Sequence, residues 1–222
     1  MKTFSFVIPT FNHYPLLHQT LFDIYQKCST VDEIIVVDDA STDTDYHDGL
    51  AWWKSNNMFT NLRHVKMSQN VGFLKASNAG LKKATSDVVC LLSNDVRIRK
   101  DIVREIVGKI SLEWKMLIGG RYLDWDTGWN IFDNRLFPYL DGWLLATTRE
   151  SWEELGYFDE RFVPSDMEDI DISTKALTLG YNLIALPSDM THHLGGQSIG
   201  FNPARESITL ANKEKFRNKW MK

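Results

Sequence analysis

The feature that most constrains the fold is a set of short apolar runs, each ending abruptly in polar residues. The clearest run covers residues 88–92 and is followed by Ser93, Asn94 and Asp95. A short apolar run that begins with β-branched residues is typical of a strand buried on both faces, although a piece of buried helix also fits. As a strand, it predicts that Asp95 lies at a carboxyl end, where open α/β sheets bind ligands. As a local pattern, the same cluster also fits a turn and helix cap.

The rest of the chain alternates apolar runs with segments of helical spacing. We expect strands at residues 4–8, 34–37, 62–67, 88–92, 116–122, 141–147 and 182–187. Helices are expected at residues 15–28, within 44–60, and at 76–84, 101–110, 149–155 and 168–179. This alternation predicts an α/β protein with a mostly parallel, doubly wound sheet flanked by helices. Residues 123–140 lack periodicity, as in a binding loop or an irregular surface excursion.

The composition fits one globular domain with no general affinity for polyanions. Of 222 residues, 43% are hydrophobic and 24% are charged, and the formal net charge is −4, which disfavours nucleic acid and anionic membrane as partners. No segment approaches the roughly 18 apolar residues that span a bilayer, and the first apolar run is too short for a signal peptide. Cys28 and Cys90 read as reduced core residues. We therefore expect a cytoplasmic protein, with membrane attachment through an acceptor or a partner left open.

Seven short segments, taken in order, resemble the inverting family 2 glycosyltransferases of the GT-A fold, especially their rhamnosyltransferase-like branch. They are residues 6–12, 35–43, 70–73, 91–96, 156–162, 168–171 and 193–198. Their joint order over residues 4–198 carries the resemblance. It implies a single GT-A domain over residues 1–222, with a nucleotide-binding half at about 1–98, an acceptor-binding half at about 99–200 and a C-terminal helical tail at about 201–222. The tail is expected to pack through Leu210, Phe216 and Trp220.

The resemblance implies a nucleotide-diphosphate sugar as donor, with uracil or thymine as the base. An Asp39 carboxylate would accept the ring N–H of either base, because a carboxylate is an acceptor only. The other residues of the nucleotide pocket would be Pro9, Thr10 and Asn12. Residues bordering the sugar and phosphates would be Asn70, Gly72, Asn78 and Asn94. The first two of these also fit plain turn chemistry, although a glycine permits a close backbone approach.

A divalent cation, Mn²⁺ or Mg²⁺, is the cofactor that the resemblance implies. Asp95 matches the last carboxylate of the family's D-x-D motif, in which Ser93 and Asn94 stand at the first two positions. His193 matches a histidine that approaches the metal or the diphosphate, whereas His192 is out of register with that motif. Such hard cations take oxygen ligands and use substrate phosphates to complete their shell. Because the first acid is missing, a strict metal requirement stays open.

The catalytic base implied by the resemblance is Asp169, at the start of a predicted helix. Glu168 beside it would bind acceptor hydroxyls, and Asp141, Gly142 and Trp143 would shape the acceptor pocket. Acids at a helix start also favour the helix dipole, so capping is the plain alternative for Glu168 and Asp169.

The acceptor would be a glycan or another molecule that bears a hydroxyl, and a nucleic-acid hydroxyl is not excluded. The donor sugar, the linkage and the oligomeric state stay open. Two other functions compete with this one. A sugar nucleotidyltransferase would carry a glycine-rich basic loop after the first strand, where this chain has Pro9, Thr10, Phe11 and Asn12. A non-catalytic sugar-nucleotide-binding module would share the fold without the activity.

Overall fold

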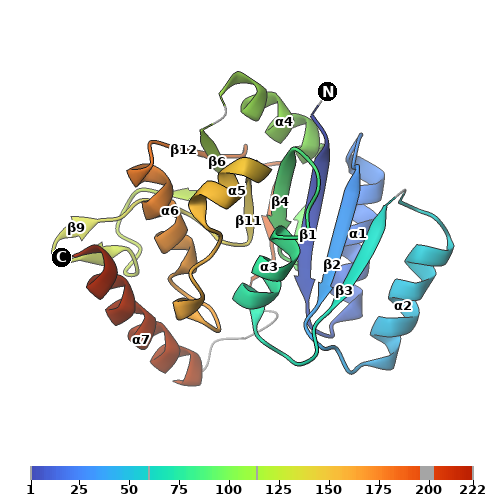
Figure 1. Ribbon diagram of the computed structural model, residues 1–222, viewed down its shortest axis with the longest axis horizontal. Helices are drawn as coiled ribbons and strands as arrows, with labels where there is room; N and C mark the ends of the chain where they lie inside the picture. Colours follow the sequence, from blue (N-terminus) through green and yellow to red (C-terminus); the bar gives the residue numbers. More distant parts are fainter. Residues whose placement is uncertain (1, 60, 114, 196–202, 222) are drawn as a thin grey trace.

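A seven-stranded sheet forms the centre of the computed structural model (Figure 1), which describes residues 2–59, 61–113, 115–195 and 203–221. From edge to edge the strands are β12 (Asn182–Ala185), β6 (Met116–Gly119), β11 (Leu144–Thr148), β4 (Val88–Leu92), β1 (Phe4–Thr10), β2 (Glu33–Asp38) and β3 (Leu62–Lys66). β11 runs antiparallel to both of its neighbours, and the other neighbouring pairs are parallel. The predicted α/β class with a mostly parallel sheet is therefore confirmed.

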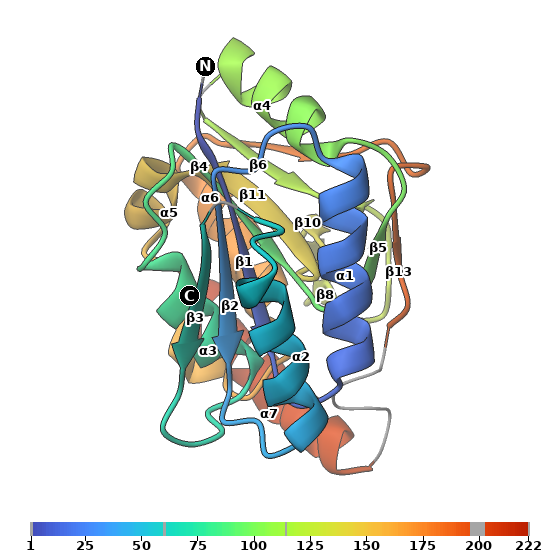
Figure 2. The same ribbon diagram turned by 90° about the vertical axis from the view of Figure 1, so that its right-hand side faces the viewer.

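Helices cover both faces of this sheet (Figure 2). One face packs against α1 (Tyr14–Lys27), α2 (Thr44–Ser55) and α4 (Ile102–Leu112). The other packs against α3 (Phe73–Leu81), α5 (Arg149–Leu155), α6 (Glu168–Thr178) and Phe216 of α7 (Pro203–Trp220). Side chains alternate between the two cores along each strand, so Phe6 and Ile8 enter the first core and Val7 enters the second. Burial on both faces explains why the strands are continuous apolar runs.

Short elements that the periodicity missed lie outside the main sheet. β5 (Val96–Ile98) pairs antiparallel with β13 (Thr191–His193), which lies almost a hundred residues later in the chain. The aperiodic residues 123–140 form pieces of two small sheets, in which β7 (Tyr122–Leu123) pairs with β10 (Tyr139–Leu140) and β8 (Ile131–Phe132) pairs with β9 (Arg135–Leu136). A 3₁₀ helix, η1 (Glu160–Phe162), precedes α6. Strands of two or three residues are too short to show a period of two.

Helix α7 packs on the domain through two of the three residues that the sequence predicted, Phe216 and Trp220. Phe216 is fully buried and stacks on Phe132 with ring centroids 4.8 Å apart. Leu210, in contrast, is 61% exposed, so its predicted packing is wrong. The buried face runs through Thr209, Asn212 and Phe216, and Leu210 is turned away from it by the helical rotation.

Three other sequence expectations meet the described structure here. Cys28 and Cys90 are both free, and Cys90 is buried in the core. No helix among the described residues is long and apolar enough to cross a membrane. Residues 196–198 of the last resembling segment, and residues 201–202 and 222 of the predicted tail, lie outside the described residues.

Candidate active site

The carboxyl ends of β1 and β2 lie side by side, because their register pairs Thr10 with Asp38. Asp38 is fully buried, and one of its carboxylate oxygens accepts a hydrogen bond from the backbone N–H of Ser41 at 2.7 Å. Asp39 is 4% exposed and accepts backbone N–H groups of Val71 at 2.8 Å and Gly72 at 2.9 Å. A carboxylate has about four acceptor positions, so each oxygen of Asp39 keeps one for a ligand. Asp39 therefore ties the loop before α3 to the end of β2.

Asn12 ties a second loop to the end of β1. Its backbone is left-handed, with φ at 52°. The Asn12 side-chain oxygen accepts hydrogen bonds from the backbone N–H groups of Thr42 at 2.8 Å and Asp43 at 3.2 Å. The backbone N–H of Asn12 donates to the Ser41 hydroxyl at 2.8 Å. Asn12 thus holds the loop between β2 and α2 in place.

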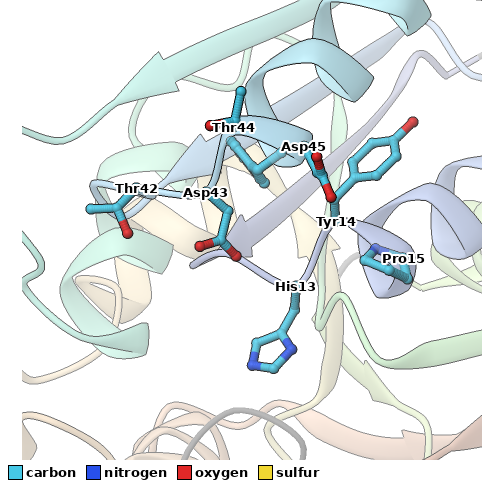
Figure 3. A pocket seen from close by; sticks show the side chains of 8 residues that line it. His13, Tyr14, Pro15, Thr42, Asp43, Thr44 and Asp45 are labelled. Atoms are coloured by element: carbon cyan, nitrogen blue, oxygen red, sulfur yellow. The ribbon is translucent and has the colours of Figure 1, made fainter.

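A pocket of about 550 Å³ opens between the segments that begin α1 and α2 (Figure 3). It is lined by His13, Tyr14, Pro15, Thr42, Asp43, Thr44, Asp45 and Tyr46. None of the predicted site residues lines it, although Asn12 adjoins both of its walls through the contacts above. The pocket therefore borders the predicted nucleotide residues, and neither Glu168 nor Asp169 lines it.

Two asparagines predicted at the donor site are buried and serve different parts of the structure. Asn94 is 4% exposed and donates to the Thr10 hydroxyl at 3.0 Å, which joins the ends of β4 and β1. Asn78 is 2% exposed, accepts the N–H of Phe158 at 3.0 Å and donates to the Phe158 carbonyl at 2.9 Å. In this structure Asn78 therefore connects α3 to the segment before η1. Of the other predicted donor residues, Pro9 is buried in β1 and Asn70 is exposed.

Asp95 and His193 meet just beyond the end of β4. The pairing of β13 with β5 sets His193 opposite Val96, and its Nε2 lies 3.1 Å from Oδ1 of Asp95. The same oxygen accepts the Ser93 hydroxyl at 2.7 Å. Burial opposes ionisation of Asp95, but the hydrogen bonds from His193 and Ser93 outweigh it and lower the pKa of Asp95 below its ordinary value. Asp95 is therefore a carboxylate at neutral pH.

Trp143 connects this pair to the start of β11. Its indole ring stacks on His193, with centroids 5.1 Å apart and planes 18° apart. The indole N–H donates to Asp141 at 3.1 Å, and Asp141 also forms an ion pair with Arg121 at 2.6 Å. Because His193 covers one face of the indole, Trp143 orients that histidine in this structure.

Gly142 brings Asp169 against the same segment. The Gly142 N–H points at Oδ2 of Asp169 from 3.4 Å, and a Cβ at position 142 would lie 3.2 Å from the Asp169 Cβ. Asp169 begins α6 together with Glu168, which is 7% exposed. Oε2 of Glu168 is buried and has no hydrogen-bond partner among the described residues.

The two adjacent acids differ in their readiness to ionise. Burial and the neighbouring charge of Asp169 raise the pKa of Glu168 well above its ordinary value. Burial and the charge of Asp141 raise the pKa of Asp169 to about 7, although the N–H groups of Ile170 and Gly142 favour its ionised form. Asp169 therefore exchanges a proton near neutral pH, which suits a general base.

The donor set at Asp95 fits a divalent cation with few protein ligands. Among the described residues, no group of three or more His, Cys, Asp or Glu side chains is arranged to hold a metal. Asp95 and His193 supply one oxygen and one nitrogen whose 3.1 Å separation is close to the ~3 Å between neighbouring ligands in an octahedral shell with bonds near 2.1 Å. Two such ligands suit a cation that completes its shell with water and phosphate oxygens.

The described contacts thus form two connected groups of predicted residues. Thr10, Asn12, Asp39, Gly72 and Asn94 cluster at the ends of the parallel strands. The second group contains Asp95, Asp141, Gly142, Trp143, Glu168, Asp169 and His193. Asn94 and Asp95 are consecutive and join the two groups.

Three residues near these groups were missed by the sequence analysis. Arg121 pairs with Asp141, and the only signal was a basic residue near the end of a predicted strand. Tyr139 is buried, and burial with the nearby charge of Asp169 raises the pKa of Tyr139 to about 12. Phe11 is 42% exposed directly after β1. The available signal in the sequence was a large apolar residue between Thr10 and Asn12.

The residue pattern of the family described as Glycosyl transferase family 2 matches residues 5–177. This stretch includes the strand ends, Asp95 and the two adjacent acids Glu168 and Asp169 of α6.

The chain belongs to glycosyltransferase family 2.

Solved structures share the fold of this glycosyltransferase. The mannosyltransferase PcManGT from Pyrobaculum calidifontis, in complex with GDP-Man and Mn²⁺, matches with a TM-score of 0.71 and 22% identity over 89% of this chain and 58% of its own. GalNAc-T7 with UDP, GalNAc and Mn²⁺ matches with a TM-score of 0.80 and 20% identity over 100% of this chain and 49% of its own. TarS residues 1–349 from S. aureus, in complex with UDP, matches with a TM-score of 0.64 and 22% identity over 83% of this chain and 57% of its own.

These likenesses confirm the GT-A fold of the glycosyltransferase. The chain spans between 49% and 58% of the length of the three solved chains. No curated protein matches the sequence.

Proposed function

We propose that this glycosyltransferase moves a sugar from a nucleotide-diphosphate donor to an acceptor hydroxyl, with inversion at the anomeric carbon. The observation that carries the proposal is the connected group of side chains in which residues 141–143 link Asp169 to His193 and Asp95. Burial and the charge of Asp141 also raise the pKa of Asp169 to about 7. Such a reaction needs a base for the acceptor proton and stabilisation of the departing diphosphate. Asp169 would serve as the base, and the group around Asp95 would face the diphosphate.

The nucleotide would bind at the carboxyl ends of β1 and β2. Asp39 would accept a ring N–H of the base in addition to the backbone groups that it already binds. Thr10 and Asn12 would line the same site, and the exposed ring of Phe11 offers a flat apolar surface beside them. The similar solved structures contain GDP-Man, UDP and GalNAc, so the choice among uracil, thymine and guanine is a question for direct binding measurements.

The proposed transfer is one displacement. The acceptor oxygen forms a bond to the anomeric carbon while the bond from that carbon to the diphosphate oxygen breaks, and the bonding electrons leave with the diphosphate. The acceptor proton passes to a carboxylate oxygen of Asp169. Glu168, with its unpaired buried Oε2 and its raised pKa, would hold an acceptor hydroxyl by a hydrogen bond. Gly142 keeps Asp169 close to the segment that carries Trp143.

A divalent cation would be held by Asp95 and His193. Two of the similar solved structures contain Mn²⁺, which favours this cation over Mg²⁺ as the first to test. When bound, it would neutralise charge on the departing diphosphate. Ser93 donates to Asp95 and Trp143 stacks on His193, so both proposed ligands are already oriented by neighbours.

The acceptor side would lie toward the segment 123–140, and we propose a glycan as the acceptor. Trp125 is 54% exposed and Trp129 is 49% exposed in this segment. Tyr139 belongs to the same segment and lies near Asp169, so the segment reaches the proposed base. Aromatic rings suit the apolar face of a pyranose.

The test begins with calorimetric titration of the purified protein with UDP, dTDP, GDP and ADP, each in Mn²⁺ and in EDTA. Metal-dependent binding of one or two of these nucleotides, followed by transfer from the matching nucleotide sugar, is the expected result. Failure to bind any nucleotide would refute the donor site. Binding without sugar release to any offered glycan or to water would favour a non-catalytic module.

A further inference from the structure

The turn that presents the two acids has an unusual backbone. Asp166 and Met167, directly before Glu168, are both left-handed, with φ at 74° and 77°. Residues with a Cβ rarely adopt this conformation, and two in succession persist only where the surrounding structure holds them. Asp169 depends on this turn, because α6 begins at Glu168.

Asn212 of α7 holds the turn from behind. Its side-chain nitrogen lies 2.8 Å from the carbonyl oxygens of Phe162 and Ser165 and 3.1 Å from that of Asp166. Its side-chain oxygen accepts from Lys215 at 2.8 Å, which accords with this orientation of the amide. Asn212 is 1% exposed, so its hydrogen bonds are shielded from water. One buried side chain thus binds the backbone on both sides of residues 163–164 and within the strained turn.

The rest of α7 binds the same region through side chains. The Asp166 carboxylate accepts from Arg205 at 2.7 Å and from the Thr209 hydroxyl at 2.6 Å. Two residues after Asp169, the Asp171 carboxylate accepts from Lys219 at 2.9 Å and from the Trp220 indole at 2.7 Å. Figure 1 shows α7 lying beside α6 along this contact. Helix α7 therefore anchors the chain both before and after the proposed base.

The same turn also contacts the proposed donor side. A Cβ at Gly72 would lie 3.2 Å from Cβ of Pro164, so the loop bound by Asp39 packs directly against residue 164. The segment 163–167 thus lies between the donor loop and α7. A shift of this segment would move Asp169 relative to the donor.

We propose that Asn212 is a positioning residue for sugar transfer, holding the left-handed turn at Asp166 and Met167 so that Asp169 faces the acceptor. The inference rests on the proposed function. The side-chain N–H groups of Asn212 donate to backbone carbonyls and its oxygen accepts from Lys215, so Asn212 acts through Asp169. A purely structural role would lower the stability of the whole domain and leave the turnover of the folded enzyme unchanged.

The experiment compares Asn212→Ala with Asn218→Ala. Asn218 is an exposed asparagine on the same helix, and its side chain donates a hydrogen bond to Glu214. For Asn212→Ala we expect kcat to fall about 10²-fold, as for a base misplaced by about 1 Å, while the nucleotide Kd changes less than about twofold. Hydrogen exchange should speed up in residues 163–171 and not in residues 1–98. The Asn218→Ala variant should match the wild type in all three measurements.

A kcat equal to that of the wild type in folded Asn212→Ala would overturn the inference, as would an equal loss in nucleotide affinity or unchanged exchange in residues 163–171. If Asn212→Ala does not fold, Thr209→Val tests the same turn, because it removes the hydroxyl that bonds Asp166 and the Arg205 carbonyl and keeps the side-chain shape. A smaller fall in kcat with unchanged nucleotide affinity is then expected, and unchanged kcat refutes the role. A wild type that transfers no sugar refutes the proposed function instead, and is recognised before any variant is made.

Discussion

Replacing the proposed base by asparagine should abolish transfer and stabilise the protein at alkaline pH. Asp169→Asn keeps an oxygen for one of the two N–H groups that the carboxylate binds, those of Ile170 and Gly142, but it cannot take a proton from the acceptor. General-base catalysis contributes about 10²- to 10⁴-fold, so kcat should fall by that factor. Nucleotide affinity should change less than about twofold, because the described contacts connect Asp169 to Gly142 and Ile170 and not to the strand ends that carry Thr10 and Asp39.

The stability effect follows from the raised pKa of Asp169. Folding lifts that pKa from 3.8 to about 7, so the folded state binds the proton more tightly than the unfolded chain does. Below pH 3.8 Asp169 is protonated in both states and does not change the free energy of unfolding. As pH rises from 3.8 to about 7, its ionisation lowers the free energy of unfolding progressively, and above about pH 7 the loss is complete. The shift corresponds to roughly 4 kcal/mol, and solvent screening at the half-buried carboxylate reduces the expected gain for asparagine to about 2 kcal/mol.

The assay is urea denaturation of both proteins at pH 4 and pH 8.5, alongside transfer kinetics across the same range. Asp169→Asn should exceed the wild type in free energy of unfolding at pH 8.5 and equal it at pH 4. Wild-type kcat should rise with pH to a plateau above a midpoint near 7, as the base ionises. Equal stabilities at pH 8.5, or a kcat that is flat from pH 5 to 9, would refute the reasoning.

Three further perturbations test other parts of the structure. Asp95→Ala should weaken nucleotide binding in Mn²⁺ by at least about tenfold and leave binding in EDTA unchanged, and calorimetry that finds both unchanged would disprove the ligand role. Gly142→Ala should lower kcat about tenfold without a matching loss of nucleotide affinity, because the new Cβ lies 3.2 Å from the Asp169 Cβ; steady-state kinetics at wild-type level would contradict this. Gly80→Ala should lower the free energy of unfolding by about 1–3 kcal/mol, since the new Cβ would lie 2.4 Å from Cγ1 of Val7. Gly108 has open space around it, so Gly108→Ala should raise the free energy of unfolding by up to about 1 kcal/mol.

The proposed division of labour gives the two adjacent acids different environments. Glu168 has an unpaired buried oxygen and a pKa raised well above its ordinary value, while Asp169 receives backbone N–H groups that hold its pKa to about 7. In the proposed mechanism Glu168 would hold an acceptor hydroxyl while its neighbour Asp169 would accept the proton. Separate environments for neighbouring carboxyl groups are a general way to obtain an acid and a base at the same pH.

Much of the fold could be predicted because buried strands impose a local pattern. Runs such as residues 88–92 are apolar on both faces, and the polar residues that follow, including Asp95, come where the chain leaves the core. The parallel strand ends gather at one edge, so Thr10, Asp39 and Asn94 cluster as a consequence of topology. The sequence of residues 123–140 shows no such pattern, because the strands in this segment are only two residues long.

The partner of each polar group, in contrast, was decided by tertiary structure alone. His193 reaches Asp95 because β13 pairs with β5, and Asn212 reaches the turn before Asp169 because α7 packs back onto it. Asn78 shows the same limit, since it turns inward to bind the backbone of Phe158. By itself the sequence determined the α/β class, the strand ends and the family. It left these pairings undetermined, because local periodicity records which side of an element is buried, whereas a hydrogen bond between distant residues depends on how whole elements pack.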